Sequence, residues 1–565
     1  MSYMKQYEAW CKNPYFNERT KQELRSIAGN EEEIKDRFYK ELEFGTGGLR
    51  GIIGAGTNRM NIYTVRKATQ GFANFIIKEG KQDMGVAIAY DSRSMSEEFS
   101  EEAALCLNAN GIKTYRFNSL RPTPELSFAL RKLGCCAGIV ITASHNPPEY
   151  NGYKVYWEDG AQITAPKDRQ IIDEVKSVAI ESDVKTMSRE DAIASQLYHV
   201  IGKEIDDCYM EELKKLILSK EAIAKEAENL SIVYTPLHGT GNLPVQRILK
   251  EIGFNHVHVV KQQELPDGNF PTVSYPNPED PNAFRLALEL AEEINADLVL
   301  ATDPDADRLG VYAKDSKTGN YIPFTGNMSG VLIGEYELER KRELGILSEN
   351  GALIKTIVTT NMADALAKEY GVKLIEVLTG FKYIGEQIKF FEQNQNYKYE
   401  FGFEESYGCL VGTHARDKDA IAAVMVLCEA AAYYKTKGFT LWDQMLKIYE
   451  KYGFYKETLG TITLKGMEGS KKIAEIMSKM RQTGLCEVAG KKVITVRDYE
   501  KQEETGLPKS NVLYFELEDD CWFCVRPSGT EPKIKFYFGV KAETMERAEC
   551  LLNQLKEEVL NQFGA

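Results

Sequence analysis

The chain has 565 residues, and because domains usually hold about 100–200 residues, a single compact core is excluded and three to five domains are expected. Hydrophobic residues make up 43% and charged residues 27% of the chain, which is an ordinary globular composition. The 84 acidic and 70 basic side chains give a net charge of −14. No broad basic face is therefore available for a nucleic-acid backbone or an anionic membrane, and we expect neither as a partner.

The cysteines and the N-terminus bear on the expected compartment. No stretch approaches the ~20 apolar residues of a membrane helix, and the first residues lack the basic-then-apolar build of a signal peptide. The eleven cysteines are scattered and odd in number, which indicates reduced thiols rather than a disulfide framework. We therefore expect a cytoplasmic protein.

In chain order, residues 1–43 are charge-rich with helical spacing and predict an N-terminal helical cap. A regular alternation of apolar runs and helical stretches follows, with runs at 85–93, 113–117 and 135–144 and helices at 96–111 and 124–134. This β-α-β-α-β pattern is typical of a largely parallel sheet covered by helices.

The same alternation returns at residues 231–303 and again at 352–434. After Tyr452 the pattern changes to four strands, a helix near 470–482 and a closing helix over 543–563, which predicts a smaller antiparallel domain. The fold class is α/β, with three consecutive mixed-sheet α/β domains followed by a C-terminal α+β domain. The expected boundaries are 1–204, 205–320, 321–450 and 451–565.

The segment ITASHNPPEYNGYKVYWEDG contains the first candidate site. Ser144 directly follows an apolar strand in a loop shaped by Asn146 and two prolines, with His145 and Lys154 close by. A hydroxyl presented in this way can act as a nucleophile or carry a phosphate, and the alternative is a loop serine in a tight turn. An esterase elbow is excluded because no glycine flanks the serine.

The segment DLVLATDPDADRLG contains the second candidate site. Asp303, Asp305 and Asp307 alternate directly after an apolar strand, so three carboxylates can converge on one point. Such anions repel one another unless a cation offsets them, and oxygen ligands favour Mg²⁺. The glycine and distant glutamate of an EF-hand are missing. An acidic surface turn is the alternative.

Two further loops carry polar groups. In YEFGFEESYG, Glu404, Glu405 and Ser406 are suited to sugar hydroxyls, although a solvated acidic turn has the same pattern. In VRPSGTEPKIKFYF, a guanidinium, hydroxyls and backbone N–H groups meet between two strands as a phosphate site requires, with a plain hairpin turn as the alternative. The residues of this second loop are Arg526, Ser528, Gly529, Thr530 and Lys533.

Other motifs are weaker. The loop FGTGGLRG lacks the G-x-G-x-x-G spacing of a dinucleotide site, although its Arg50 can face an anion. Cys521 and Cys524 are three positions apart in an apparent strand, where side chains face opposite ways, so we expect buried thiols rather than a redox or zinc pair.

The four loops, in this order along the chain, resemble those of the α-D-phosphohexomutase family of phosphoglucomutases and phosphomannomutases, over nearly the whole length. The resemblance implies four domains around a central cleft. It identifies Ser144 as the phosphoserine and implies that Asp303, Asp305 and Asp307 bind Mg²⁺ together with the serine phosphate. The other implied active-site residues, among them the general acid and base, are Arg50, His145, Lys154, Arg308 and Lys382.

The resemblance also implies the substrate contacts. Glu404 and Ser406 hold sugar hydroxyls, while Arg526, Ser528, Gly529, Thr530 and Lys533 hold the phosphate that is not transferred. The bisphosphate intermediate must turn around between two transfers, so we expect a mobile fourth domain on a flexible stretch before Tyr452.

The implied activity is the interconversion of glucose 1-phosphate and glucose 6-phosphate through glucose 1,6-bisphosphate. The segments FGTGGLRGIIGAGTNRMN and GFEESYG are closer to the branch with phosphopentomutases, so phosphopentomutase or phosphomannomutase activity is the alternative. A non-catalytic sugar-phosphate-binding protein is a remote alternative, because loss of catalysis predicts damage to at least one motif and every motif is intact. The expected partners are small sugar phosphates, and the expected assembly is a monomer or dimer.

Overall fold

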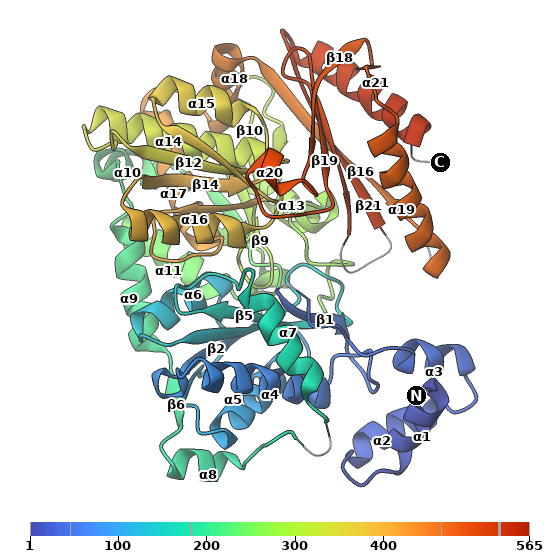
Figure 1. The fold of residues 1–565 in the computed structure, drawn as a ribbon. Coiled ribbons are helices and arrows are strands. Elements are labelled where there is room, and N and C mark those ends of the chain that lie inside the picture. Colours follow the sequence, from blue (N-terminus) through green and yellow to red (C-terminus); the bar gives the residue numbers. More distant parts are fainter. Residues whose placement is uncertain (1, 46, 181–182, 465, 529–532, 564–565) are drawn as a thin grey trace. The chain divides into compact units, whose positions relative to one another are not determined.

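The computed structural model describes residues 2–45, 47–180, 183–464, 466–528 and 533–563 (Figure 1). Contacts divide the chain into two units. Unit 1 comprises Met1–Gly326, Phe381–Tyr399 and Ser406–Thr440. Unit 2 comprises Asn327–Gly380, Glu400–Glu405 and Leu441–Ala565. The chain therefore passes between the units several times within the third predicted domain.

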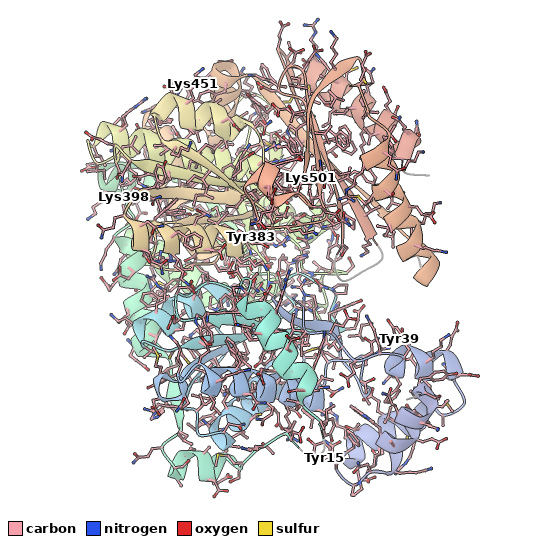
Figure 2. All side chains as sticks on the ribbon, in the orientation of Figure 1. Tyr15, Tyr39, Tyr383, Lys398, Lys451 and Lys501 are labelled. Atoms are coloured by element: carbon pink, nitrogen blue, oxygen red, sulfur yellow. The ribbon has the colours of Figure 1, made fainter. Side chains whose placement is uncertain are left out.

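Three short helices form the N-terminal cap of unit 1, as predicted: α1 (Tyr3–Lys12), α2 (Glu18–Ser26) and α3 (Glu31–Phe38). Their core is aromatic, with the Trp10 ring stacked 4.1 Å from Phe16. Trp10 also lies 5.6 Å from Tyr63 of the long helix α4 (Ile62–Lys78), which attaches the cap to the first domain. Figure 2 labels Tyr15 and Tyr39 on this part of the chain.

The first sheet has the order β1-β5-β4-β2-β3-β6. The neighbouring strands β4, β2, β3 and β6 are parallel, whereas β5 pairs antiparallel with β4 and with β1, so the sheet is mixed. The apolar run and the Lys154 segment thus form a hairpin, with Ser144 in its loop. The strands are β1 (Gly48–Ile52), β2 (Val86–Tyr90), β3 (Thr114–Phe117), β4 (Ala137–Ile141), β5 (Tyr150–Trp157) and β6 (Tyr198–Ile201).

Helices cover this sheet, and α6 (Thr123–Lys132) packs on β2 and β4. The strand β1 and the helix α4 were not expected, because the glycine-rich stretch before residue 62 shows neither strand nor helix periodicity. The other helices are α5 (Ser96–Ala109), α7 (Lys167–Ser177), α8 (Arg189–Ala194), α9 (Lys203–Lys214) and α10 (Lys220–Glu226).

The second sheet has the order β11-β10-β9-β7-β8, with β7, β8 and β9 parallel and β10 and β11 antiparallel to their neighbours. Strand β9 is fully buried and ends at Thr302, so the aspartate segment begins at its carboxyl end. The elements are β7 (Ile232–Thr235), α11 (Asn242–Ile252), β8 (Val257–Val259), α12 (Lys261–Glu264), α13 (Arg285–Ile294), β9 (Leu298–Thr302), β10 (Leu309–Lys314) and β11 (Tyr321–Phe324).

The third sheet has the order β13-β12-β14-β15, with β12 and β13 parallel. Its elements are α14 (Gly326–Glu343), β12 (Gly351–Thr356), α15 (Met362–Tyr370), β13 (Lys373–Val377), α16 (Phe381–Asn394), β14 (Lys398–Glu404), β15 (Gly408–Val411), α17 (Ala420–Thr436) and α18 (Leu441–Tyr452). Helix α17 is buried along nearly its whole length, which explains its continuous apolar sequence.

The fourth sheet, in unit 2, has the order β16-β21-β20-β19-β18-β17 and is antiparallel. Helices α19 (Gly466–Gln482) and α21 (Met545–Phe563) pack along it (Figure 1). The remaining elements are β16 (Phe454–Thr463), β17 (Glu487–Val488), β18 (Lys491–Asp498), α20 (Gln502–Thr505), β19 (Leu513–Leu517), β20 (Trp522–Pro527) and β21 (Lys533–Ala542). The three mixed-sheet α/β domains and the C-terminal α+β domain agree with the predicted fold class.

The expected flexible stretch before Tyr452 is wrong. Helix α18 runs to Tyr452, and β16 begins two residues later at Phe454. Within unit 2, Glu335 of α14 accepts hydrogen bonds from Lys451 Nζ (3.1 Å) and from the Tyr452 hydroxyl (2.9 Å). These partly buried polar contacts fix the end of α18.

Two expectations concern the cysteines and the membrane. All eleven cysteines are free thiols, as expected. Cys521 and Cys524 are both buried, and burial raises the pKa of the Cys524 thiol. Among the described residues, none of the helices combines the length and apolar character needed to cross a bilayer.

Candidate active site

The serine loop at the end of β4 is held in an unusual backbone conformation. Ser144 has a φ of 51°, which is uncommon for a residue other than glycine. The buried guanidinium of Arg93 donates to the carbonyl oxygens of Ser144 (2.5 Å), Pro147 (2.8 Å) and Tyr150 (3.1 Å), and also to that of Asn146. The side chain of Arg93 thus stabilises the loop through four of its carbonyl groups. Its pKa is lowered by burial.

The hydroxyl of Ser144 points at the aspartate segment. Its Oγ donates to Asp303 Oδ2 at 2.7 Å and lies 3.1 Å from His145 Nδ1. Ser144 is 3% exposed. The two strongest segments of the sequence, which are 159 residues apart, therefore meet within unit 1.

The three aspartates converge as their alternation predicts. They are buried, and one carboxylate oxygen from each of Asp303, Asp305 and Asp307 lies within 4.8 Å of the others. Asp303 Oδ1 accepts from the backbone N–H groups of Asp307 (3.1 Å) and Arg308 (3.0 Å), which locks its orientation. Burial, followed by the charges of the other two aspartates, raises the pKa of Asp303.

These residues fit a divalent cation. The Oδ1 atoms of Asp305 and Asp307 are buried and accept no hydrogen bond from the part of the chain that the structure describes. Buried carboxylate oxygens without partners cost free energy unless a cation satisfies them. A set of oxygen ligands alone suits a hard ion such as Mg²⁺.

Two lysines offset the acidic cluster. Lys154 of β5 lies 2.8 Å from Asp305 and 3.5 Å from Asp307. Burial disfavours charge on both partners. Nevertheless, the lysine holds the pKa of Asp305 well below its usual range, and the two aspartates raise the pKa of Lys154. Lys418, between β15 and α17, lies 3.2 Å from Asp307 and was not expected at the site.

Thr123 and Arg93 were also missed. The hydroxyl of Thr123, at the start of α6, donates to Asp305 Oδ2 at 2.9 Å across 182 residues. No local pattern marks Thr123, Arg93 or Lys418 as site residues. The only available signal is that Lys418 lies within a charged run, ARDKD, just before a long helix.

The remaining predicted residues of unit 1 lie at differing distances from the cluster. Arg50 of β1 donates to Asn146 Oδ1 at 3.2 Å, on the serine loop. Arg308 pairs with Glu279 and lies 3.9 Å from Asp307. Burial and then the charges of Arg308 and Arg50 lower the pKa of His145. Lys382, at the start of α16, lies 5.1 Å from the Tyr383 ring centroid, so its part in the site stays a prediction.

In unit 2, Glu404 ends β14 and is buried. The side chain of Glu405 accepts from the hydroxyls of Thr356 (3.0 Å) and Thr359 (3.4 Å). Burial and the charge of Glu404 raise the pKa of Glu405 to about 7, against a smaller lowering by Arg526. Arg526 of β20 is thus close enough to affect this loop. Ser406 belongs to unit 1.

The predicted phosphate loop lies between β20 and β21. Strands β20 and β21 pair antiparallel, and the N–H of Ser528 donates to the carbonyl oxygen of Lys533 at 2.7 Å. Gly529 and Thr530 lie outside the described residues. The phosphate interpretation and the plain-turn alternative both stay predictions, because turns between strands also bind anions.

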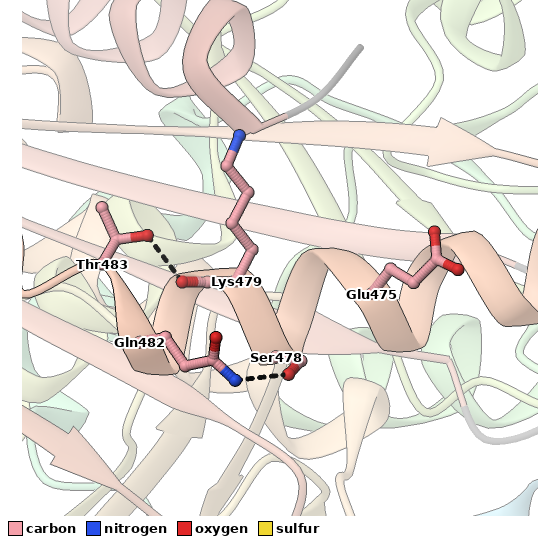
Figure 3. Close-up of a pocket in the computed structure, with 5 residues that line it drawn as sticks. All are labelled: Glu475, Ser478, Lys479, Gln482 and Thr483. Atoms are coloured by element: carbon pink, nitrogen blue, oxygen red, sulfur yellow. Dashed lines mark hydrogen bonds between the residues drawn. The ribbon is translucent and has the colours of Figure 1, made fainter.

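A pocket of about 350 Å³ lies on the surface of α19 and contains none of these residues (Figure 3). Its lining comes from the end of one helix, where Gln482 donates to the hydroxyl of Ser478 at 3.2 Å. Without convergent charges from a second element, this hollow offers no chemistry comparable to the serine and aspartate cluster.

Comparison with known proteins agrees with the geometry. Residues 41–181, 207–318 and 325–452 match the α/β/α domains I, II and III of phosphoglucomutase/phosphomannomutase. The phosphoglucomutase of Staphylococcus epidermidis is 37% identical over 524 residues, covering 91% of this chain and 93% of that protein. The phosphoglucomutase of Staphylococcus aureus (strain USA300) is 38% identical over 536 residues, covering 93% and 94%.

Solved structures share the fold. Parafusin from Paramecium, a phosphoglucomutase in its open form, has a TM-score of 0.70 at 19% identity, covering 93% of this chain and 95% of that one. A phosphoglucomutase/phosphomannomutase family protein from Burkholderia thailandensis has a TM-score of 0.67 at 19% identity, covering 92% and 98%. The chain belongs to the phosphoglucomutase/phosphomannomutase family, and it is accordingly a phosphohexomutase enzyme.

Proposed function

We propose that the enzyme is a Mg²⁺-dependent phosphoglucomutase that interconverts glucose 1-phosphate and glucose 6-phosphate. The observation that carries this proposal is the hydrogen bond from Ser144 to Asp303 within a buried cluster of three aspartates. The Staphylococcus relatives named phosphoglucomutase support glucose as the sugar. Phosphopentomutase and phosphomannomutase activity remain the alternatives, because the same machinery serves them.

In this proposal Ser144 carries the phosphoryl group. A sugar hydroxyl attacks the phosphorus, the bond from phosphorus to Ser144 Oγ breaks, and glucose 1,6-bisphosphate forms. The sugar hydroxyl gives up its proton and Oγ gains one. His145, 3.1 Å from Oγ, and Lys154 are the candidates for these transfers. The second half repeats the step in reverse at the other phosphate.

The charges of the site act on the moving phosphoryl group. Phosphoryl transfer spreads negative charge over the equatorial oxygens, so positioning and electrostatic stabilisation supply most of the catalysis. Asp303, Asp305 and Asp307 would hold Mg²⁺, which when bound neutralises charge on the phosphoryl oxygens. Lys154, Arg50, Arg308 and Lys382 would add positive charge.

The other residues would hold the sugar and its second phosphate. Glu404 accepts hydrogen bonds from sugar hydroxyls, and Ser406 donates one to them. A separate set of residues holds the phosphate that is not being transferred. That set is Arg526, Ser528, Gly529, Thr530 and Lys533. Free thiols throughout the chain support a cytoplasmic location, and we expect a monomer or dimer.

Initial rates on the 1-phosphates of glucose, mannose, ribose and deoxyribose test the choice of sugar. We expect the highest kcat/KM with glucose 1-phosphate. A clearly higher value for a pentose 1-phosphate or for mannose 1-phosphate would assign the enzyme to that sugar instead. Absence of turnover on all four would favour a non-catalytic sugar-phosphate-binding protein.

A further inference from the structure

A second cavity lies within unit 1, outside the proposed active site. It has a volume of about 340 Å³, which falls in the range of small-molecule sites. Its lining comes from three separate parts of the chain. These are Phe128, Arg131 and Lys132 of α6, Glu212 and Lys215 at the end of α9, and His414 of the loop between β15 and α17.

The lining carries an excess of positive charge. The lining holds three cations, Arg131, Lys132 and Lys215, and one carboxylate, that of Glu212, which pairs with Lys215 at 2.6 Å. Outside the lining, Glu392 lies 3.8 Å from Arg131. Arg131 Nη1 donates to the carbonyl oxygens of Thr413 (2.8 Å) and His414 (2.9 Å), which fixes the guanidinium at the cavity wall. Burial, together with the charge of nearby Arg416, lowers the pKa of Arg131 to about 10. A bound anion would offset this disfavoured charge.

His414 adds a buried polar atom that lacks a partner. Its Nε2 lies 2.6 Å from Asp419 Oδ2, which also accepts from the hydroxyl of Tyr209 at 2.7 Å. Nε2 is therefore committed to Asp419. The other ring nitrogen, Nδ1, is buried and has no hydrogen-bond partner among the described residues. The His414 side chain is 4% exposed, and the residue lines the cavity. A ligand hydroxyl can donate to it.

The loop that holds His414 also reaches the acidic cluster. Four residues after His414, Lys418 Nζ lies 3.2 Å from Asp307 Oδ2. Between them, Asp417 accepts from the hydroxyl of Tyr156 at 2.8 Å, and the N–H of Arg416 donates to Ser127 of α6 at 2.8 Å. A ligand that contacts both α6 and His414 therefore acts on the segment that positions Lys418.

We propose that this cavity binds a small organic phosphate and thereby regulates the enzyme through the loop over residues 412–419. The phosphate oxygens contact Arg131, Lys132 and Lys215, and a ligand hydroxyl donates to His414 Nδ1. Binding here does not depend on which sugar the active site accepts.

Calorimetric titration of the full-length enzyme with glycerol phosphate tests this site, because any binding at the active site is common to the parent and to variants of this cavity. The variant K132Q/K215Q removes two exposed cations of the lining, and K203Q/K220Q removes two exposed lysines outside it as a charge-matched control. We expect a binding event in the parent and the control whose Kd is at least about tenfold higher in K132Q/K215Q. Equal Kd values in all three proteins would overturn the proposal.

Two further measurements separate the ligand chemistry and the regulatory effect. His414→Gln should raise the Kd for glycerol phosphate by about tenfold, as expected for one lost hydrogen bond, with its Tm measured to confirm folding. Malonate binding as tightly as glycerol phosphate would contradict the assignment to phosphates. Glycerol phosphate should change kcat in the parent but not in K132Q/K215Q. Purely competitive inhibition, the same in both proteins, would show binding only at the active site.

Discussion

The acidic cluster of unit 1 and the glutamate loop of unit 2 hold their carboxylates in different ways. In unit 1, Lys154 and Lys418 lie within 3.5 Å of Asp305 or Asp307, so buried charge is met by opposite charge. In unit 2, Glu405 lies beside Glu404, and its pKa is raised to about 7. In the first arrangement the nearby lysine favours the ionised form of Asp305, whereas the second leaves the carboxyl group of Glu405 near half-protonation at neutral pH.

The largest expected effect on activity comes from removing the hydroxyl of Ser144 in the proposed active site. Ser144→Ala should lower kcat by about 10⁴-fold or more, the order of loss seen when a nucleophile is removed, while sugar-phosphate binding remains measurable by calorimetry. Ser119→Ala, at an exposed serine, is the matched control. Normal mutase activity in the alanine variant at position 144 would remove this serine from the mechanism.

A smaller loss is expected when one carboxylate of the cluster is neutralised. Asp305→Asn removes a proposed metal ligand and leaves Lys154 without its nearest carboxylate partner, so kcat should fall about 10²- to 10³-fold. Mg²⁺ should raise the Tm of the parent enzyme more than that of the variant, because a ligand that binds only the folded state stabilises it. EDTA should inhibit the parent.

Asp207→Asn, in a surface ion pair, serves as the control for charge alone. If neither EDTA nor Asp305→Asn altered kcat, the cluster would not hold a catalytic cation, and the contrast between the two regions would lose its functional meaning.

Lys418 tests whether the balancing cations matter as much as the carboxylates. Lys418→Met removes the ammonium 3.2 Å from Asp307 and should lower kcat about 10- to 100-fold. Lys418→Arg should recover part of the rate, because it restores the charge at a slightly different position. Lys437→Met, at the end of α17, should leave kcat unchanged. A rate equal to the parent's in Lys418→Met would mean that Lys154 alone balances the cluster.

The smallest effect concerns stability in unit 2. The pKa of Glu405 is about 7 in the folded chain against a usual value of 4.5, so the folded state binds the proton more tightly. Stability from this group is present at low pH and is lost as the pH rises from about 4.5 through 7. Glu405→Gln does not titrate. Relative to the parent, it should therefore gain on the order of 2 kcal/mol in free energy of unfolding between pH 5 and pH 8.

Urea denaturation at several pH values measures this difference. Glu516→Gln, at an exposed position of β19 in the same unit, provides the matched control. A difference between Glu405→Gln and the parent that does not change with pH would place Glu405 in an ordinary solvated environment, like the acidic turn that its sequence also permits.

Much of the fold follows from local patterns. The apolar runs that end before Ser144 and Asp303 were expected as strands because short runs bounded by turns and followed by helical spacing are typical of α/β units, and they are β4 and β9. Helix α4 was missed because its sequence begins next to a glycine-rich stretch and its buried face is broad, with eleven of its residues buried.

The site was predictable only in part. The alternation of the aspartates predicts that they converge, because all three lie within five residues of one strand end. Thr123, Arg93 and Lys418 reach the site through tertiary packing, and hydrogen bonds across large sequence separations leave no periodic signal. The flexible stretch expected before Tyr452 was wrong because the sequence does not show that Glu335 binds Lys451 and Tyr452.

The central claim is that Ser144 carries the phosphoryl group. Incubating the enzyme with glucose 1,6-bisphosphate labelled in both phosphates, quenching in acid and mapping the label by peptide mass spectrometry tests it directly. The account predicts up to one label per chain, on Ser144, that disappears when unlabelled glucose 1-phosphate is added. Label on another residue, or turnover in a protein that never acquires label, would contradict it.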